Sequence, residues 1–316
     1  MNPQNQSAVL LLAHGSPDRV EEIPEFLGYV TGGRPLPDAV VKEVQHRYGL
    51  IGSSPLTRIT LRQGELLEHE LKLPVYVGMR NWHPLTGDVV KRIQQDGMTR
   101  VVAICLAPQN SRTSVGLYRS ALLGDSGNAP FEVDFVDNWH DHPLLIKAFA
   151  QKLTAGWQRA CDEAGARVPI IFTAHSVPER TITEGDPYEA QAKETASLVA
   201  MEVPQLTVDD WQFAFQSQGM SGGAWLGPTV EDTIRGLKAK GHRAVFLQPI
   251  GFLCDHVEVL YDIDIAFREF AQKESMRLWR AESLNESPTL IAALAEVARS
   301  RLEPAGEKKQ QIVQIG

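Results

Sequence analysis

The chain has only three cysteines among its 316 residues, Cys105, Cys161 and Cys254, and they lie far apart. No C-x-x-C pair is present, so neither a zinc knuckle nor a four-cysteine iron–sulfur cluster can be built from them. No apolar stretch of about 18 residues occurs, and the first apolar run, 8–13, ends at His14 with no charged region before it. We therefore expect no transmembrane helix and no signal peptide, and a cytoplasmic location.

Positive charge is also scarce. The 31 Lys and Arg residues are outnumbered by 39 Asp and Glu residues, which gives a formal net charge of −8. Nucleic acids and anionic membranes bind a basic face, so we expect no nucleic-acid partner and at most peripheral membrane contact. The hydrophobic and charged fractions, 43% and 22%, are ordinary for a soluble globular chain of about two domains.

Short apolar runs alternate with segments of helical pattern. Seven runs are predicted strands: 8–13, 73–79, 100–108, 131–136, 168–174, 211–217 and 243–252. Most are too continuously apolar for a sheet with one wet face, which indicates parallel strands buried on both sides. The segments between them include two that end in Gly, as helices often do. This alternation predicts βαβ units in an α/β fold.

Two parts of the chain repeat the same order of features. Residues 82–108 and 225–249 each contain Trp, Pro, Thr, an acidic residue, a helical segment, Gly, Arg, an apolar run and Pro. Two of the predicted strands also end in the same dipeptide, Ala-His. Any two βαβ units share part of this order, but the combination favours two similarly built halves, 1–145 and 146–316.

Candidate functional residues follow the predicted strands. Ligands of open α/β sheets bind at the carboxyl ends of the strands, so His14, His175 and the end of the 243–252 run are expected to line one cleft between the halves. The last run leads into the most polar cluster of the chain, residues 251–267. This cluster is therefore the first place to seek groups that act together with the two histidines.

A helix that begins near Asp255 would place Asp255, Glu258 and Asp262 on one face. Asp255 fits a helix cap best, whereas Glu258 is expected to point toward the cleft. A histidine opposite these carboxylates suits a divalent metal or a proton relay. A single histidine at a strand end is also often structural, so spacing alone leaves the role of His175 open.

Two polar loops supply further candidates. They contain Arg34, Arg47, Tyr48, Ser53 and Ser54 in the first loop, and Asn110, Ser111, Arg112, Thr113, Ser114 and Tyr118 in the second. Hydroxyl and guanidinium groups suit a ligand with carboxylates or phosphates, although a solvated loop has a similar composition. The sequence contains no glycine-rich phosphate loop and no nucleophile elbow.

In chain order, the motifs AHGSP, RYGLIGSSPL, WHPLT, AHSVPER, QSQG, WLGPTVEDT and PIGFLCDHVEVLYDID resemble those of ferrochelatases, enzymes that insert ferrous iron into a porphyrin during heme synthesis. The resemblance covers residues 8 to about 265. It implies two Rossmann-like domains with parallel sheets facing a central cleft, a class II chelatase-like fold. The cysteine-rich extension of one branch is absent, so the resemblance implies no cofactor and no iron–sulfur cluster, with Fe²⁺ as a substrate.

The resemblance also implies roles for residues. His175 corresponds to the active-site histidine, Glu258 to the glutamate that faces it, Asp262 to an extension of the acidic face, and His256 to a supporting group. The division of labour between His175 and Glu258 stays open, and our hypothesis is that His175 accepts the proton while Glu258 and Asp262 are the carboxylates of the metal side or the proton exit. His175, Glu258, Asp262 and His14 are the residues implied to meet the metal. The residues implied to hold the porphyrin are His14, Arg47, Tyr48, Ser54, Arg112, Tyr118 and Trp225. Many relatives have Tyr where this chain has His14, so His14 either ligates iron or only forms a hydrogen bond.

Two porphyrins are candidate substrates. The A-x-G-x-P start and the moderately apolar region 21–37 look closer to coproporphyrin-type enzymes than to protoporphyrin-type enzymes with a membrane-facing lip. Coproporphyrin III has four propionates and needs more polar donors than protoporphyrin IX, which favours coproporphyrin III here. A sirohydrochlorin-type chelatase and a non-enzymatic tetrapyrrole carrier are the alternatives. The D-H-x-E-x-L-Y-D motif disfavours the former, and tight binding without turnover would identify the latter. A monomer is expected.

Overall fold

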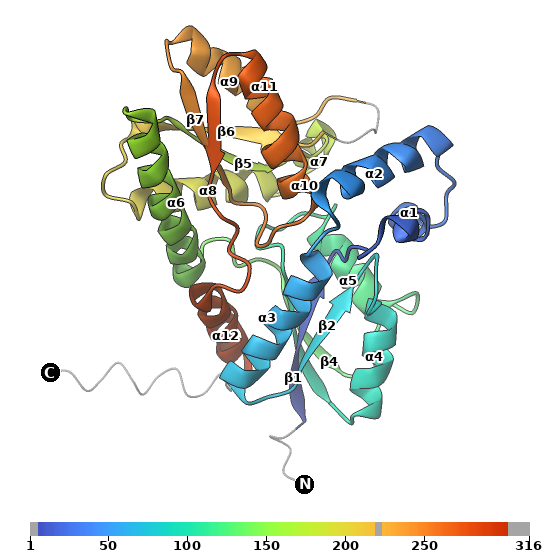
Figure 1. Cartoon of the computed structure of the whole chain (residues 1–316). Helices are drawn as coiled ribbons and strands as arrows, with labels where there is room; N and C mark the ends of the chain where they lie inside the picture. The colour runs from blue at the N-terminus through green and yellow to red at the C-terminus, as the bar shows by residue number, and fades with distance from the viewer. Residues whose placement is uncertain (1–5, 219–222, 303–316) are drawn as a thin grey trace, which may run out of the picture.

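The computed structural model describes residues 6–218 and 223–302 and contains two four-stranded parallel sheets (Figure 1). The first has the order β2 (Val75–Met79), β1 (Ser7–Ala13), β3 (Arg100–Cys105), β4 (Glu132–Val136). The second has the order β6 (Trp211–Gln216), β5 (Ile170–His175), β7 (Ala244–Pro249), β8 (Arg277–Arg280). The predicted α/β fold with parallel, buried strands is therefore confirmed.

The seven predicted strands are all present, and an eighth, β8, was missed. This strand has only four residues and pairs with β7 alone at the sheet edge. Arg277 is exposed and only Leu278 is fully buried. An edge strand of this kind carries neither a continuous apolar run nor a long alternation, so pattern reading does not detect it.

The two sheets are built in the same way, as the repeated order of features in residues 82–108 and 225–249 predicted. In each, the first strand of the half lies between the second and the third strands, and the fourth is at the edge. The segments after β2 and β6 also correspond: the Met79 amide donates to the Pro84 carbonyl, and the Phe215 amide donates to the Pro228 carbonyl, both at 2.8 Å. The Trp-containing repeat segments therefore occupy matching positions.

Helices cover both faces of each sheet. Their bounds are α1 Ile23–Thr31, α2 Asp38–Ile51, α3 Leu56–Leu71, α4 Thr86–Gln95, α5 Val115–Leu123, α6 Pro143–Ala164, α7 Glu179–Thr183, α8 Tyr188–Met201, α9 Val230–Ala239, α10 Val257–Leu260, α11 Arg268–Lys273 and α12 Pro288–Leu302. Short 3₁₀ helices span Val20–Glu22 and Val208–Asp210, and a π-helix spans Asp262–Phe267. Within residues 6–218 and 223–302, no helix combines the length and apolarity needed to cross a bilayer.

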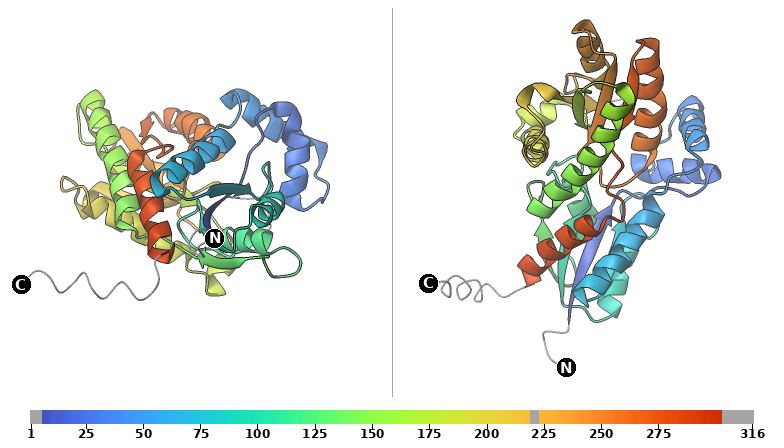
Figure 2. Two further views of the ribbon diagram at one scale, coloured as in Figure 1. Left: turned by 90° about the horizontal axis from the view of Figure 1, so that it is seen from below. Right: turned by 60° about the vertical axis from the view of Figure 1, so that its left-hand side comes forward.

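One core connects the two halves. It contains buried residues from β1 and β3 of the first sheet, from β5 and β7 of the second, and from α6, α8 and α12. α12 packs against both α3 and α6, so the last helix returns to the first half (Figure 2). The predicted division between residues 145 and 146 falls in the first turn of α6. Gly156 of α6 lies so close to Phe246 of β7 that an added Cβ would be 2.8 Å from the ring.

Candidate active site

His14 and His175 end the corresponding strands β1 and β5, and the backbone holds both rings in the same way. The Nδ1 atom of His14 is 2.9 Å from the Gly15 carbonyl oxygen, and that of His175 is 2.5 Å from the Ser176 carbonyl oxygen. A carbonyl oxygen only accepts hydrogen bonds, so each Nδ1 carries the proton. In its neutral form each ring therefore presents a lone pair on Nε2.

Glu258 of α10 lies between two histidines. Its Oε1 atom is 3.6 Å from His175 Nε2, and its Oε2 atom is 3.7 Å from His256 Nε2. The His256 ring is held in turn by its Nδ1, which donates to the Cys254 carbonyl at 3.0 Å. The side chains of His175 and Glu258 are 33% and 34% exposed, so a bound molecule can reach both. The structure thus brings together the predicted pair and its predicted support.

The carboxylates of this region differ in the direction of their pKa shifts. Burial acts to raise the pKa of Glu258, but the positive charges that His175, His256 and His14 carry when protonated, together with a hydrogen bond from His256, outweigh it and lower the pKa to about 2. Burial raises the pKa of Asp262, against the lowering effect of the hydrogen bond that Ser217 donates to it. Glu258 therefore stays ionised at neutral pH, and Asp262 takes up a proton more readily than an ordinary aspartate.

The predicted common face of Asp255, Glu258 and Asp262 is wrong for Asp255. The residue before α10 is His256, which forms no side-chain cap, and Asp255 lies outside the helix. The Asp255 carboxylate instead accepts hydrogen bonds from Ser283 and Asn285. Beyond α10 the chain enters the π-helix, in which Asp262 remains close enough to Glu258 and His175 for their charges to affect its pKa.

Arg47 of α2 reaches the π-helix. Its Nη1 atom is 4.0 Å from Asp262 Oδ1, and its guanidinium carbon lies 4.9 Å from the ring centroid of Tyr261. Nε also forms a 2.9 Å ion pair with Glu43. α2 lies beside α10 in Figure 1, so a residue from the first half contacts the acidic helix of the second.

The other residues predicted to hold a porphyrin are spread over several elements. The Tyr48 hydroxyl is 2.9 Å from Ser16 Oγ, and burial raises the pKa of Tyr48 to about 12, so the phenol is protonated. Ser54 is 1% exposed, and its hydroxyl accepts a hydrogen bond from the Leu56 amide at the start of α3.

Three further predicted porphyrin contacts lie in loops or on α5. Arg112 pairs with Glu184 across the second polar loop. Tyr118 on α5 is buried. Trp225 forms an antiparallel bridge with Pro178, which places the WLGP segment next to the loop after His175. Their distance from a bound porphyrin stays a prediction.

Arg80 and Asn81 were missed. The Asn81 Nδ2 atom is 2.9 Å from His14 Nε2 and donates to it. The backbone N–H of Asn81 also donates to the His14 carbonyl oxygen. Arg80 lies 6.0 Å from the Tyr118 ring centroid, and its buried Nε has no hydrogen-bond partner among the described residues. Both residues directly follow β2, so the strand-end rule that selected His14 would also have found them.

The surroundings of His14 disfavour its protonated form. Burial is the main cause that lowers the pKa of His14, and the charge of Arg80 lowers it further. Burial also lowers the pKa of Arg80.

We call His14, Asn81, His175, His256 and Glu258 the strand-end site. The strand-end site contains imidazole and carboxylate groups, which can accept protons. Within residues 6–218 and 223–302, no group of three or more His, Cys, Asp and Glu side chains is arranged to hold a metal ion. The site instead combines unprotonated imidazole nitrogens with an ionised carboxylate. Such a set can accept protons from a ligand that supplies other metal-binding atoms.

The fold is shared with solved structures of chelatases. The structure of SirB from Bacillus subtilis with Fe3+ matches with a TM-score of 0.56 at 11% identity, over 93% of this chain and 95% of that one. At this identity the likeness shows the fold alone.

The sequence comparisons are more specific than the fold. The family model named Ferrochelatase matches residues 6–302. A ferrochelatase of Acidobacterium capsulatum is 55% identical over 95% of this chain and 96% of its own. A coproporphyrin III ferrochelatase of Geobacillus sp. is 32% identical over 95% and 99%. The chain belongs to the ferrochelatase family and is an enzyme.

Proposed function

We propose that this enzyme inserts Fe²⁺ into coproporphyrin III, which yields coproheme for heme biosynthesis. The observation that carries the proposal is the pair at the second strand end, where His175 directs Nε2 to within 3.6 Å of an ionised Glu258 and binds the backbone through Nδ1. Metal insertion requires a group that takes protons from the pyrrole nitrogens, and this pair suits that task.

The reaction releases two protons for each Fe²⁺ that enters the ring. In this proposal His175 Nε2 accepts a pyrrole proton, and the adjacent Glu258 carboxylate stabilises the resulting imidazolium. Asp262, whose pKa is raised by burial, receives protons on their way out. A protonated His175 cannot also ligate metal, so Glu258 and Asp262 serve as the carboxylates on the metal side. His14 is the proposed metal contact from the first half.

Cationic and hydroxyl groups of the first half suit the propionates. Arg80 is partly buried beside Tyr118 and has an unpartnered Nε among the described residues, which a carboxylate would satisfy. Arg47 and Arg112 are partly exposed and can exchange their present acidic partners for a substrate. Tyr48, Ser54, Tyr118 and Trp225 complete the proposed porphyrin contacts. The relative named coproporphyrin III ferrochelatase supports the choice of a four-propionate substrate.

The test is anaerobic Fe²⁺ insertion by the purified protein, followed by absorbance, with coproporphyrin III and protoporphyrin IX compared side by side. We expect faster turnover of coproporphyrin III. A preference for protoporphyrin IX would overturn the substrate assignment but keep the reaction. Tight binding without turnover of either porphyrin would favour a carrier instead.

A variant sharpens the substrate assignment. Arg80→Met removes the unpartnered guanidinium, so we expect the KM for coproporphyrin III to rise by about tenfold, and less for protoporphyrin IX. Arg119→Met is the matched control, because Arg119 pairs with Asp137 and stacks on Phe135 away from the strand-end site. Equal KM values in wild type and Arg80→Met would exclude Arg80 from propionate binding.

A further inference from the structure

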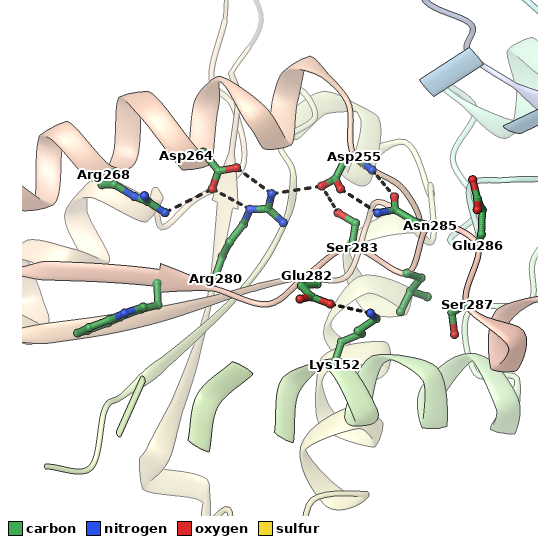
Figure 3. Close-up of a pocket in the computed structure, with 12 residues that line it drawn as sticks. Lys152, Asp255, Asp264, Arg268, Arg280, Glu282, Ser283, Asn285, Glu286 and Ser287 are labelled. Atoms are coloured by element: carbon green, nitrogen blue, oxygen red, sulfur yellow. Dashed lines mark hydrogen bonds and ion pairs between the residues drawn. The ribbon is translucent and has the colours of Figure 1, made fainter. Parts of the chain in front are cut away.

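A pocket of about 530 Å³ lies beside Asp255, Asp264 and Arg280 and is also lined by residues 282–287 (Figure 3). It is lined by charged residues, but its cations are already paired: Lys152 with Glu282 at 2.8 Å, and Arg268 with Asp264 at 3.6 Å. The pocket therefore offers little free charge to a ligand. Its most buried cation is Arg280, whose side chain is 13% exposed.

Arg280 joins two points of the segment that carries the acidic site residues. Its Nε and Nη2 atoms donate to the two carboxylate oxygens of Asp264 at 2.8 and 2.7 Å, and Nη2 is also 3.2 Å from Asp255 Oδ1. Figure 3 shows the guanidinium between the two carboxylates. Asp255 precedes α10 and Asp264 lies in the π-helix, so a single side chain at the end of β8 links both.

Asn285 also holds Asp255, through two further hydrogen bonds. It accepts a hydrogen bond from the Asp255 amide through Oδ1 and donates to the Asp255 carboxylate through Nδ2, both at 2.8 Å. Its own amide donates to the Leu253 carbonyl at 2.8 Å. Gln63, a buried residue of α3, donates to the Asn285 carbonyl at 2.6 Å. The network is therefore attached to the first half as well.

We propose that Arg280 is a positioning residue for metal insertion. Glu258 and Asp262 lie between Asp255 and Asp264 in the chain, so a frame that holds these two aspartates also sets where Glu258 and Asp262 stand opposite His175 and Arg47. A π-helix is rare and is frequently found at a functional site. This proposal depends on the proposed function of the strand-end site, because it assigns Arg280 a part in that reaction.

The test compares Arg280→Gln and Arg280→Lys with a control, Arg167→Gln. Arg167 forms the same two-pronged pair with Asp210, including a 2.6 Å contact, but on the outer surface of the second half. A displacement of about 1 Å costs on the order of 100-fold in rate, so we expect Arg280→Gln to lower kcat by about 10- to 100-fold. Arg280→Lys keeps the charge without the fork and should fall between Arg280→Gln and wild type.

Two readouts separate positioning from a loss of folding. Porphyrin affinity, measured by fluorescence quenching, should stay within about twofold of wild type in Arg280→Gln. Hydrogen exchange of peptides within residues 255–267, measured by mass spectrometry without substrate, should accelerate in Arg280→Gln and not in Arg167→Gln. Near-UV circular dichroism reports the folded fraction of each variant.

Three results would overturn the proposal: an unchanged kcat in Arg280→Gln, unchanged exchange in residues 255–267, or a loss of kcat that only follows the loss of folded protein. The exchange measurement requires no turnover. A wild-type protein that inserts iron into neither porphyrin would therefore sink the proposed function, while the exchange result would still decide whether Arg280 holds the segment in place.

Discussion

The two halves of the molecule end a central strand with the same device but give it different neighbours. Both His14 and His175 carry a proton on Nδ1, which donates to the carbonyl of the next residue. In the first half, the Nε2 lone pair accepts a hydrogen bond from the Asn81 amide. In the second half, Nε2 faces the ionised carboxylate of Glu258.

This difference shows that the neighbour, rather than the strand-end backbone, decides what each imidazole can do. A donor amide stabilises an unprotonated Nε2, and burial and Arg80 also lower the pKa of His14. A carboxylate stabilises a proton on Nε2 and is suited to a group that must accept one. The first histidine therefore has neighbours that favour its unprotonated form, whereas the second faces a carboxylate.

The largest effect is expected from removing the second histidine. His175→Ala eliminates the proposed proton acceptor, so we expect kcat for iron insertion to fall by about 10²- to 10⁴-fold. His14→Ala is the matched comparison from the first half and should lose about tenfold or less. Equal losses in the two variants, or full activity of His175→Ala, would remove the functional distinction between the halves.

Glu258→Gln makes the second half resemble the first, because His175 then faces an amide. We expect kcat to fall by about 10- to 100-fold, since the imidazolium loses its stabilising charge. A folded Glu258→Gln protein with wild-type kcat would show that the carboxylate is dispensable.

The same variant has a pH signature in stability. The pKa of Glu258 is lowered from 4.5 to about 2 in the folded protein, so its ionisation stabilises the fold above pH 4.5 and the benefit disappears as pH falls toward 2. We expect the stability difference between wild type and Glu258→Gln, measured by urea unfolding, to shrink from pH 6 to pH 3.5. A difference that grows over this range would contradict the lowered pKa.

Asn81→Asp is the reverse exchange, because it gives His14 a carboxylate neighbour. The added negative charge should raise the pKa of His14, which NMR titration of the ring proton signals can follow. Arg80 will compete for the new carboxylate, so Asn81→Asp is best combined with Arg80→Met as a control for that competition. If the pKa of His14 were the same in the double variant as in Arg80→Met alone, residue 81 would not control the ring.

The smallest effects are expected from replacing two buried tyrosines that form hydrogen bonds near the strand ends. Tyr188 Oη donates to the His175 carbonyl at 2.9 Å, and Tyr48 Oη lies 2.9 Å from Ser16 Oγ near His14. Each Tyr→Phe change should lower the free energy of unfolding by about 1 kcal/mol, measured with urea. Tyr188→Phe should also reduce kcat by more than Tyr48→Phe does, and the opposite ranking would place the more demanding geometry in the first half.

Much of the fold and part of the site were readable from local patterns. Continuous apolar runs predicted seven buried strands, and the strand-end rule predicted that His14, His175 and the 251–267 cluster would lie together. Arg80 and Asn81 obey the same rule but were overlooked. Asp255 was placed on the wrong face, because its contacts with Ser283 and Asn285 come from residues 28 and 30 positions further along the chain.

The sequence by itself determined the parallel α/β architecture, its repetition in two halves and the histidines at the strand ends, because these depend on hydrophobic periodicity and on the chain direction of each strand. Only the tertiary structure decided which groups meet each Nε2 atom, that residues 262–267 form a π-helix, and that Arg280 of an edge strand pairs with Asp255 and Asp264. Those features depend on contacts between distant segments, and local periodicity carries no information about such contacts.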